Sequence, residues 1–252
     1  MGKRGFTLAE TLITLGIIGV VATMVIPTLH AHIRILKYAT QLKKDIATLK
    51  QVAIGGLAMN GLSYRDAAEP CTADGANDTS DEVLTLCALF NDTLTASLYV
   101  EDASTLLTDK NIQYKVTKAA EGSGLDYLPE DGVPVGYHAY MLADGSMFVF
   151  PEDAANCTKE VSICQGWIDV NGSSMPNKEV SCDGGNANAS DCSVSDNLNY
   201  LTDIYPVNFY DCTVEPSTKA GRYVLMASRY SNIDRSGKTN NSTETEPEPE
   251  GD

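Results

Sequence analysis

The sequence predicts an α+β protein in which a long N-terminal helix packs on a small antiparallel sheet. Residues 6–29 are almost wholly apolar, and residues 30–60 continue with apolar side chains at helical spacing. Short runs typical of strands, separated by turn-forming pairs, begin at residue 136. A chain of 252 residues has room for one membrane segment and one further domain.

The apolar run from Phe6 to Leu29 is 24 residues long, and Glu10 is its only charged residue. A helix of about 20 residues crosses a hydrocarbon core of ~30 Å, so residues 6–29 predict a membrane span. A secretory signal is one alternative, but its apolar stretch is about 7–15 residues long and ends at a small-residue cleavage site. A plain single-pass anchor is the other alternative, and it leaves Glu10 without a role. A carboxylate costs roughly 2.5–3.5 kcal/mol at the bilayer centre, so we treat Glu10 as a functional residue.

The helical pattern continues beyond the span, over residues 30–60. Apolar residues recur there at steps of three and four, while Asp45 and four lysines lie off the apolar stripe. The stripe consists of Ile35, Ala39, Leu42, Ile46, Leu49, Ala53 and Leu57. The pairs Gly55-Gly56 and Asn60-Gly61 are expected to end this helix. From Phe6 onward it would be ~80 Å long, and a coiled-coil anchor is the alternative for its amphipathic half.

Residues 61–235 are expected to form the globular domain. Thr79-Ser80-Asp81-Glu82 has the pattern of a capping box, and apolar residues at helical spacing follow it. A second helix is therefore expected over residues 80–99. Residues 119–136 are rich in Gly, Pro and acidic residues, which predicts a loop.

The strand signals lie in the second half of the chain. Two apolar runs flank Asp144-Gly145, a pair typical of hairpin turns. Residues 172–199 predict an irregular loop, and residues 236–252 form an acidic tail with no apolar side chain to bury, which predicts disorder. Strands are expected over residues 137–142, 146–150, 165–170, 204–214 and 222–228.

The net charge of −16 is distributed unevenly. Residues 1–50 carry seven Lys/Arg and two Asp/Glu, so residues 51–252 carry 11 and 32 of them, a net charge of −21. Nucleic-acid binding needs a basic face for the phosphates, and the acidity of the domain argues against it. Basic residues lie on both sides of the apolar run, so their distribution does not decide which side of the membrane holds the domain.

All seven cysteines follow the apolar run. They show neither C-x-x-C nor the Cys/His spacing of zinc sites, so disulfides in an oxidising compartment are favoured over a metal. Six paired cysteines allow 15 connectivities. By loop length Cys212 stays a free thiol, and the favoured pairs are Cys71–Cys87, Cys157–Cys164 and Cys182–Cys192.

No pattern of catalytic residues stands out. The sequence has no G-x-S-x-G, no H-E-x-x-H and no Walker glycine loop. His30 and His32 flank the apolar run and His138 lies in an expected strand, where surface or interfacial positions explain all three. Nothing supplies a nucleophile, a base and an orienting group together, so we expect a protein that is not an enzyme and needs no cofactor for catalysis.

The N-terminus combines a short basic start, a Gly-Phe junction and a glutamate five residues into the apolar run, in the segment Gly2-Lys3-Arg4-Gly5-Phe6-Thr7-Leu8-Ala9-Glu10. In these features it resembles the N-terminus of type IV pilins and type II secretion pseudopilins. The resemblance implies that prepilin peptidase removes residues 1–5 by cutting between Gly5 and Phe6. It also implies that Phe6 is N-methylated and that Glu10 acts in assembly.

The resemblance further implies a pilin-like fold and a structural role. The chain would be a subunit of a type IV pilus-like or type II secretion pseudopilus filament, periplasmic or at the surface. It would cross the inner (cytoplasmic) membrane once, with its C-terminal domain extracytoplasmic. Its partners would be the prepilin peptidase, other pilin or pseudopilin subunits and the assembly platform of the inner membrane. A membrane-anchored ligand-binding protein or adhesin (a minor pilin) is the alternative, and an anchored periplasmic enzyme is the third interpretation.

Major pseudopilins of type II secretion bind calcium in a C-terminal loop, so the resemblance directs attention to residues 169–177. Asp169 and Asn171 offer side-chain oxygens at alternate positions, which calcium could use. An EF-hand-type loop would have Gly and Glu where this chain has Ser174 and Val180. A hairpin-like turn at Asn171-Gly172 without a metal is the alternative.

Overall fold

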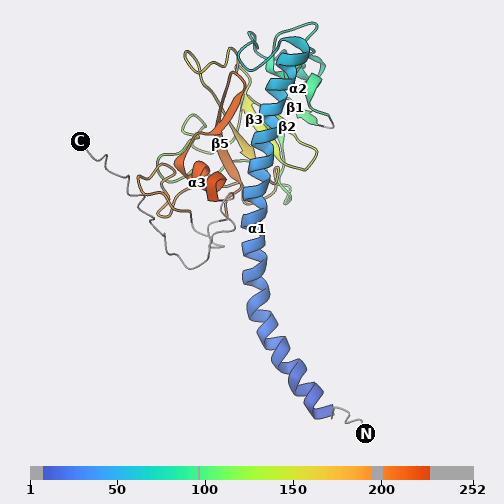
Figure 1. The fold of residues 1–252 in the computed structure, drawn as a ribbon, viewed down its shortest axis with the longest axis vertical. Coiled ribbons are helices and arrows are strands. Elements are labelled where there is room, and N and C mark those ends of the chain that lie inside the picture. The colour runs from blue at the N-terminus through green and yellow to red at the C-terminus, as the bar shows by residue number, and fades with distance from the viewer. Residues whose placement is uncertain (1–7, 96, 195–200, 228–252) are drawn as a thin grey trace, which may run out of the picture.

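A computed structural model of the chain describes residues 8–95, 97–194 and 201–227, with the backbone alone for residues 27–32. Helix α1 runs without interruption from Leu8 to Asn60, over 53 residues. Its first part projects away from the domain, and its second part lies along the other elements (Figure 1). The expected leader, residues 1–5, and the expected tail, residues 236–252, lie outside the described residues.

The second part of α1 supplies one side of the main core. Five members of the expected stripe are buried there: Ala39, Leu42, Ile46, Leu49 and Ala53. The two ends of the stripe differ from the expectation, because Ile35 is only half-buried and Leu57 is exposed. The contact with the domain therefore begins after Ile35, and near Leu57 it shifts to the neighbouring Gly56.

Two glycines have different roles at the end of α1. Gly61 has a φ of +71°, and its N–H donates to the Leu57 carbonyl at 3.2 Å, which is the left-handed ending common to helices. Gly56 was expected to help end the helix, but α1 continues past it. A Cβ at Gly56 would clash with the Leu89 side chain and the Leu62 carbonyl. Gly56 therefore permits a close approach of helix and loop.

Helix α2 spans Leu86–Thr93, so the expectation of a helix over residues 80–99 is wrong at both ends. Its N-cap is Thr85, whose hydroxyl accepts a hydrogen bond from Ala88 N at 3.0 Å. The capping-box pattern at residues 79–82 forms a turn instead. The first five residues of α2 are all buried, so tertiary packing decides where the helix begins.

The sheet has six antiparallel strands, each hydrogen-bonded to the next along the chain, in the order β1-β2-β3-β4-β5-β6. The hairpin expected at Asp144-Gly145 joins β2 to β3, and a turn at Asp211 divides the strand expected over residues 204–214. β1 was not expected. The strands are β1 (Leu98–Val100), β2 (Tyr137–Met141), β3 (Met147–Pro151), β4 (Cys164–Asp169), β5 (Ile204–Tyr210) and β6 (Thr213–Pro216). Two short 3₁₀ helices are also present: η1 (Gly75–Asn77) precedes α2, and η2 (Ala103–Thr105) follows β1.

Successive residues of the central strands face two different cores. On one face, the Phe90 ring of α2 lies 5.7 Å from Phe148 and 5.5 Å from Phe150 between ring centroids. On the other face, Val149 belongs to a second cluster with Trp167, which is completely buried. Both faces of the sheet are therefore covered, which explains why β3 is apolar at successive positions.

The segment after β6 forms helix α3 (Lys219–Ala227), so the strand expected over residues 222–228 is wrong for its described part. Thr218 precedes the helix, and its hydroxyl accepts a hydrogen bond from Gly221 N at 3.2 Å. A threonine at this position is a common N-cap. This helix-start signal is present in the sequence, but the strand interpretation overlooked it.

Asp45 is buried between α1 and the β2–β3 turn, although the sequence pattern places it off the stripe. Its Oδ1 accepts a hydrogen bond from Gln41 Nε2 at 3.1 Å, and Oδ2 has no hydrogen-bond partner among the described residues. Burial raises the pKa of Asp45 to about 7, and the charge of Asp144 adds to this effect. Ser146, Gln41 and Lys44 act in the opposite direction.

We expect Asp45→Asn to flatten the pH dependence of stability. The folded carboxyl keeps its proton up to about pH 7, whereas the unfolded one releases it near pH 4. The stabilising contribution of the proton is therefore complete below pH 4. As the pH rises from 4 through 7, the free energy of unfolding falls by up to about 1.4 kcal/mol per pH unit, and above pH 7 the contribution is lost. Denaturant unfolding at pH 5, 6, 7 and 8 measures it, with exposed Asp81→Asn as the control. Equal slopes for wild type and Asp45→Asn would contradict the prediction.

Candidate functional site

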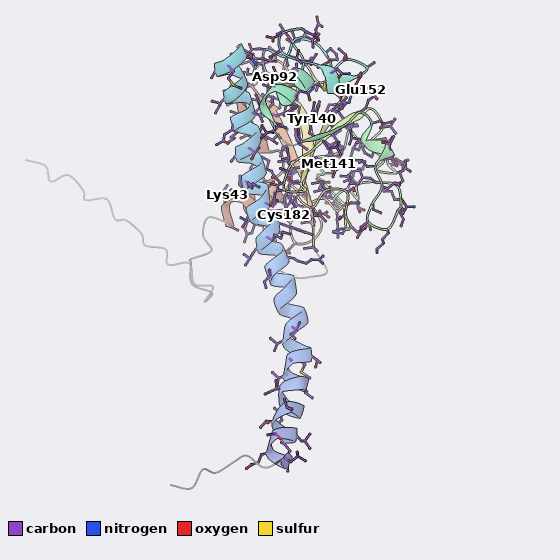
Figure 2. The ribbon with its side chains drawn as sticks, turned by 90° about the vertical axis from the view of Figure 1, so that its right-hand side faces the viewer. Lys43, Asp92, Tyr140, Met141, Glu152 and Cys182 are labelled. Atoms are coloured by element: carbon purple, nitrogen blue, oxygen red, sulfur yellow. A yellow bond between two sulfur atoms is a disulfide. The ribbon has the colours of Figure 1, made fainter. Side chains whose placement is uncertain are left out.

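The first part of α1 is the segment that could cross a membrane. Leu8–Ile26 has a mean hydropathy of 2.1, and none of this span is buried by the rest of the described chain. Every large apolar side chain in it is more than half exposed. Figure 2 shows these side chains projecting from α1 beyond the domain. Such a surface needs hydrocarbon or other apolar helices around it.

Glu10 lies in the first turn of α1 and is exposed. A carboxylate is favoured there by the positive end of the helix dipole. The hydroxyls of Thr11 and Thr14 are satisfied within the helix, since they donate to the carbonyls of Leu8 at 2.8 Å and Thr11 at 3.0 Å. Glu10 is the only charged residue among residues 8–26. The expected cleavage and methylation site, Gly5 and Phe6, lies outside the described residues.

A loop after β4 contains a second group of polar side chains. Asp169 and Asp203 are both completely buried. Tyr114 donates to Asp169 Oδ2 at 3.0 Å, and the backbone N–H groups of Asn177 and Lys178 donate to Asp203 at 2.9 and 2.7 Å. Burial raises the pKa of Asp203 to about 6 and that of Asp169 well above its ordinary value, where the charge of Asp203 adds to the effect. A positive charge nearby would favour the ionised form of both carboxyl groups.

Two side-chain amide oxygens in the same loop accept no hydrogen bond from the described residues. Asn171 Oδ1 and Asn177 Oδ1 are buried and have no hydrogen-bond partner within the part of the chain that the structure describes. Asn177 is held in the left-handed region at a φ of +49°. Carboxylate and amide oxygens are the ligands that calcium takes in proteins, so these side chains are of the type that this ion uses. Asn177 and Asp203 were not among the expected residues, because they follow Asp169 and Asn171 at irregular spacing and Asp203 immediately precedes another strand, β5.

The structure pairs the same cysteines that loop length favours. Disulfides join Cys71 to Cys87, Cys157 to Cys164 and Cys182 to Cys192, while Cys212 remains a thiol. The pairs are 16, 7 and 10 residues apart, so each bridge closes a short loop.

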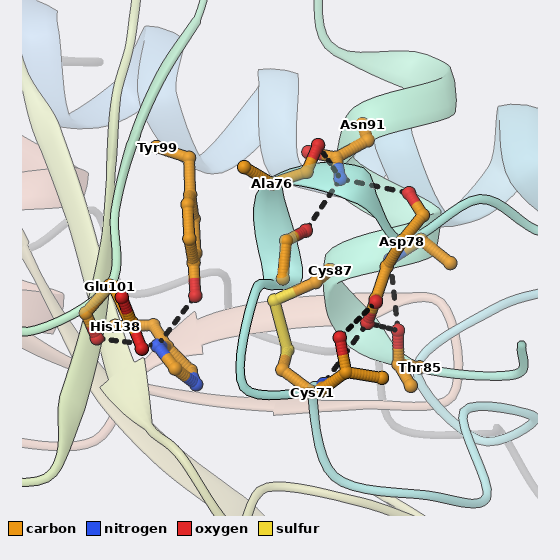
Figure 3. The surroundings of a disulfide bond; sticks show 12 residues. Cys71, Ala76, Asp78, Thr85, Cys87, Asn91, Tyr99, Glu101 and His138 are labelled. Carbon is orange, nitrogen blue, oxygen red and sulfur yellow. Dashed lines mark hydrogen bonds between the residues drawn. A yellow bond between two sulfur atoms is a disulfide. The ribbon is translucent and has the colours of Figure 1, made fainter.

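His138 is not at the surface, contrary to the expectation. It is 4% exposed, in β2, beside the Cys71–Cys87 disulfide (Figure 3). Its Nδ1 lies 2.7 Å from the Glu101 carbonyl oxygen and 2.9 Å from the Tyr99 hydroxyl. The strand pattern contains no signal for this position, because the α1–α2 segment that covers His138 comes from more than 50 residues earlier in the chain.

The prokaryotic N-terminal methylation motif matches residues 1–26 of the chain. No curated protein and no solved structure matches the chain. The motif is the signature of type IV pilins and pseudopilins, and the chain carries it directly on an apolar helix. The long helix with its six-stranded antiparallel sheet is an α+β arrangement consistent with the pilin-like fold. The motif implies processing by prepilin peptidase and assembly with other pilin subunits, and the exposed span fits a membrane anchor.

The disulfides predict the thiol count of the folded protein. Unreduced wild type should show one alkylatable thiol, Cys212, and Cys212→Ser should show none. Mass spectrometry after alkylation at mildly alkaline pH counts them, since burial raises the pKa of the Cys212 thiol. Reduction should cost stability, typically about 2–4 kcal/mol per bridge. Six or seven reactive thiols in the unreduced protein would rule the three bridges out.

Proposed function

We propose that this chain is a structural subunit of a type IV pilus-like or type II secretion pseudopilus filament. Prepilin peptidase would cut between Gly5 and Phe6, and Phe6 would be N-methylated. The subunit would wait in the inner membrane with its domain outside the cytoplasm, and the assembly platform would then add it to other pilin or pseudopilin subunits.

The observation that carries this proposal is the contrast between the two parts of α1. Residues 8–26 are apolar and uncovered, whereas Leu42, Leu49 and Ala53 are completely buried under the domain. The exposed part can be buried in a bilayer or among the same helices of neighbouring subunits. Because one continuous helix joins both parts, packing of the spans would fix the positions of the domains around a filament.

The charge of Glu10 would favour transfer of each subunit from the bilayer to a partner that compensates this charge. It is the only charged residue of the span, and a carboxylate in hydrocarbon is costly. Cleavage before Phe6 creates a new cationic amine at the start of the helix. The amine of one subunit and Glu10 of its neighbour would form a pair in the filament core. Only one axial offset between subunits brings these groups together, so the pair would also set the register.

We expect Glu10→Gln subunits to be inserted and cleaved normally but to assemble poorly, and Glu10→Leu subunits to assemble still less. Removal of one partner of a buried ion pair commonly costs about 3–5 kcal/mol, because the other charge is left unpaired. Each variant, expressed as the sole copy, is scored by filament yield in electron micrographs. Intact mass of the membrane form confirms removal of residues 1–5.

Thr14→Val is the matched control, because it changes a polar but uncharged side chain of the same exposed span. It should leave assembly unchanged. Filaments of Glu10→Leu at wild-type yield would remove the assembly role of the carboxylate. Monomeric anchored domains with affinity for a ligand would instead favour the membrane-anchored binding protein or adhesin.

Calcium in the loop after β4 would belong to this function as a stabiliser of the filament's outer domain. Asp169, Asp203, Asn171 and Asn177 would supply the oxygens. When bound, the ion would supply the positive charge that the two buried carboxylates need. It would thereby fix the loop that joins β4 to the disulfide-closed segment.

Calcium should raise the thermal stability of the domain, and removal by chelator should lower it. At a free concentration of about 100 times Kd the gain is roughly 2.7 kcal/mol, or about 5–10 °C for a chain of this size. Asp203→Asn should abolish the calcium-dependent shift in Tm, whereas exposed Asp81→Asn should retain it. A wild-type Tm that does not respond to either calcium or chelator would refute the site and would leave the filament proposal intact.

A further inference from the structure

The hydrogen bonds of His138 fix which ring nitrogen carries its proton. The Glu101 carbonyl oxygen can only accept, so Nδ1 donates to it at 2.7 Å, and the Tyr99 hydroxyl lies beside the same nitrogen. In the neutral ring, Nε2 is then the nitrogen that carries the lone pair. It is buried and has no hydrogen-bond partner in the described ranges of the chain. A histidine that donates through Nδ1 to a backbone carbonyl and leaves Nε2 open is oriented as metal-binding histidines are.

The open edge of the His138 ring faces the Cys71–Cys87 disulfide in Figure 3. One nitrogen of the ring and the two sulfur atoms all lie within 4.8 Å of one another. These atoms come from three separate elements: Cys71 from the loop after α1, Cys87 from α2 and His138 from β2. The sequence offered no zinc spacing because the three ligands are brought together by the fold alone.

A pocket of about 580 Å³ leads to this cluster. Cys71 and His138 line it, together with the acidic residues Glu101, Asp102, Glu152 and Asp153. An acidic pocket attracts cations and gives them a path from solvent. A carboxylate or a water molecule from the pocket would complete a fourth position.

We propose that Cys71, Cys87 and His138 form a zinc site whenever the Cys71–Cys87 bridge is open. The thiols exist before the bridge first closes. They also return when a dithiol reductant passes two electrons to the disulfide, two protons bind the sulfurs, and the reductant becomes a disulfide itself. Zinc then binds the two sulfurs and His138 Nε2 and releases the two thiol protons. Two thiolates and an imidazole are ligands that zinc prefers, in a site with one open position.

The two states would hold the domain together differently. The disulfide joins the loop after α1 to α2 only. Zinc would join both of these to β2 through His138, so the loop would stay fixed to the sheet without its covalent bridge. The redox state of one cysteine pair would thus decide whether the chain carries a metal.

Cobalt, which gives a thiolate charge-transfer band, is the probe for this site in the full-length protein in detergent micelles. After reduction with a phosphine and its removal, wild type should bind one cobalt ion per chain with two thiolate ligands, and added zinc should displace it. The unreduced protein should show no such band. His138→Gln should weaken zinc affinity by more than the roughly 10–100-fold that loss of an outer-shell partner costs.

The matched control removes another disulfide pair. Cys182→Ser/Cys192→Ser should keep the full cobalt band after reduction, whereas Cys71→Ser/Cys87→Ser should lose it. Cys71→Ser alone, which keeps one thiol, should retain a weaker band with one thiolate and shows whether loss in the double variant comes from misfolding. A band that survives in Cys71→Ser/Cys87→Ser, or equal affinities for wild type and His138→Gln, would overturn the proposal.

Discussion

The need to cover the apolar surface of one continuous helix governs the rest of the structure. The domain covers α1 only from Tyr38 onward, where Leu42 and Leu49 are completely buried and the Tyr64 hydroxyl donates to the Leu49 carbonyl at 2.7 Å. The span Leu8–Ile26 finds no cover in the described chain. The same helix is therefore a core element of the domain and offers the surface through which the proposed subunit would contact lipid or other subunits. A rigid helix transmits the position of one part to the other.

Glu179, Asp169 and Asp203 are buried carboxyl groups of the acidic domain. Glu179 accepts hydrogen bonds from the backbone of Ala119 and Gly124 at 2.8 Å each and from Ser123, and it thereby joins two loops. Asp203 likewise accepts from two backbone N–H groups, whereas Asp169 accepts from the Tyr114 hydroxyl and the Asn171 N–H. The charge of Asp203 adds to the effect of burial on the pKa of Asp169, and a bound cation would relieve this repulsion.

Local sequence signals predicted the elements whose structure is decided locally. The membrane span, the stripe on α1 and the hairpin at Asp144-Gly145 depend on residues a few positions apart, and the three disulfides close short loops. The errors arose where distant contacts competed with local signals. α2 begins at Leu86 because that start buries its apolar face, and β1 exists because β2 offers an edge to pair with. The missed helix α3 had a local cap at Thr218, so there the sequence sufficed and the interpretation was wrong.

The sequence by itself determined the N-terminal signature, with Glu10 as the only charge in an apolar span, because cleavage motif and hydropathy are properties of neighbouring residues. Only the tertiary structure decided which polar side chains are buried and what they meet. Asp45 is buried by the β2–β3 turn, Asp203 joins Asp169 through strand pairing, and His138 meets a disulfide from the loop after α1. Such contacts join segments that are far apart in the chain, so the local spacing of residues does not predict them.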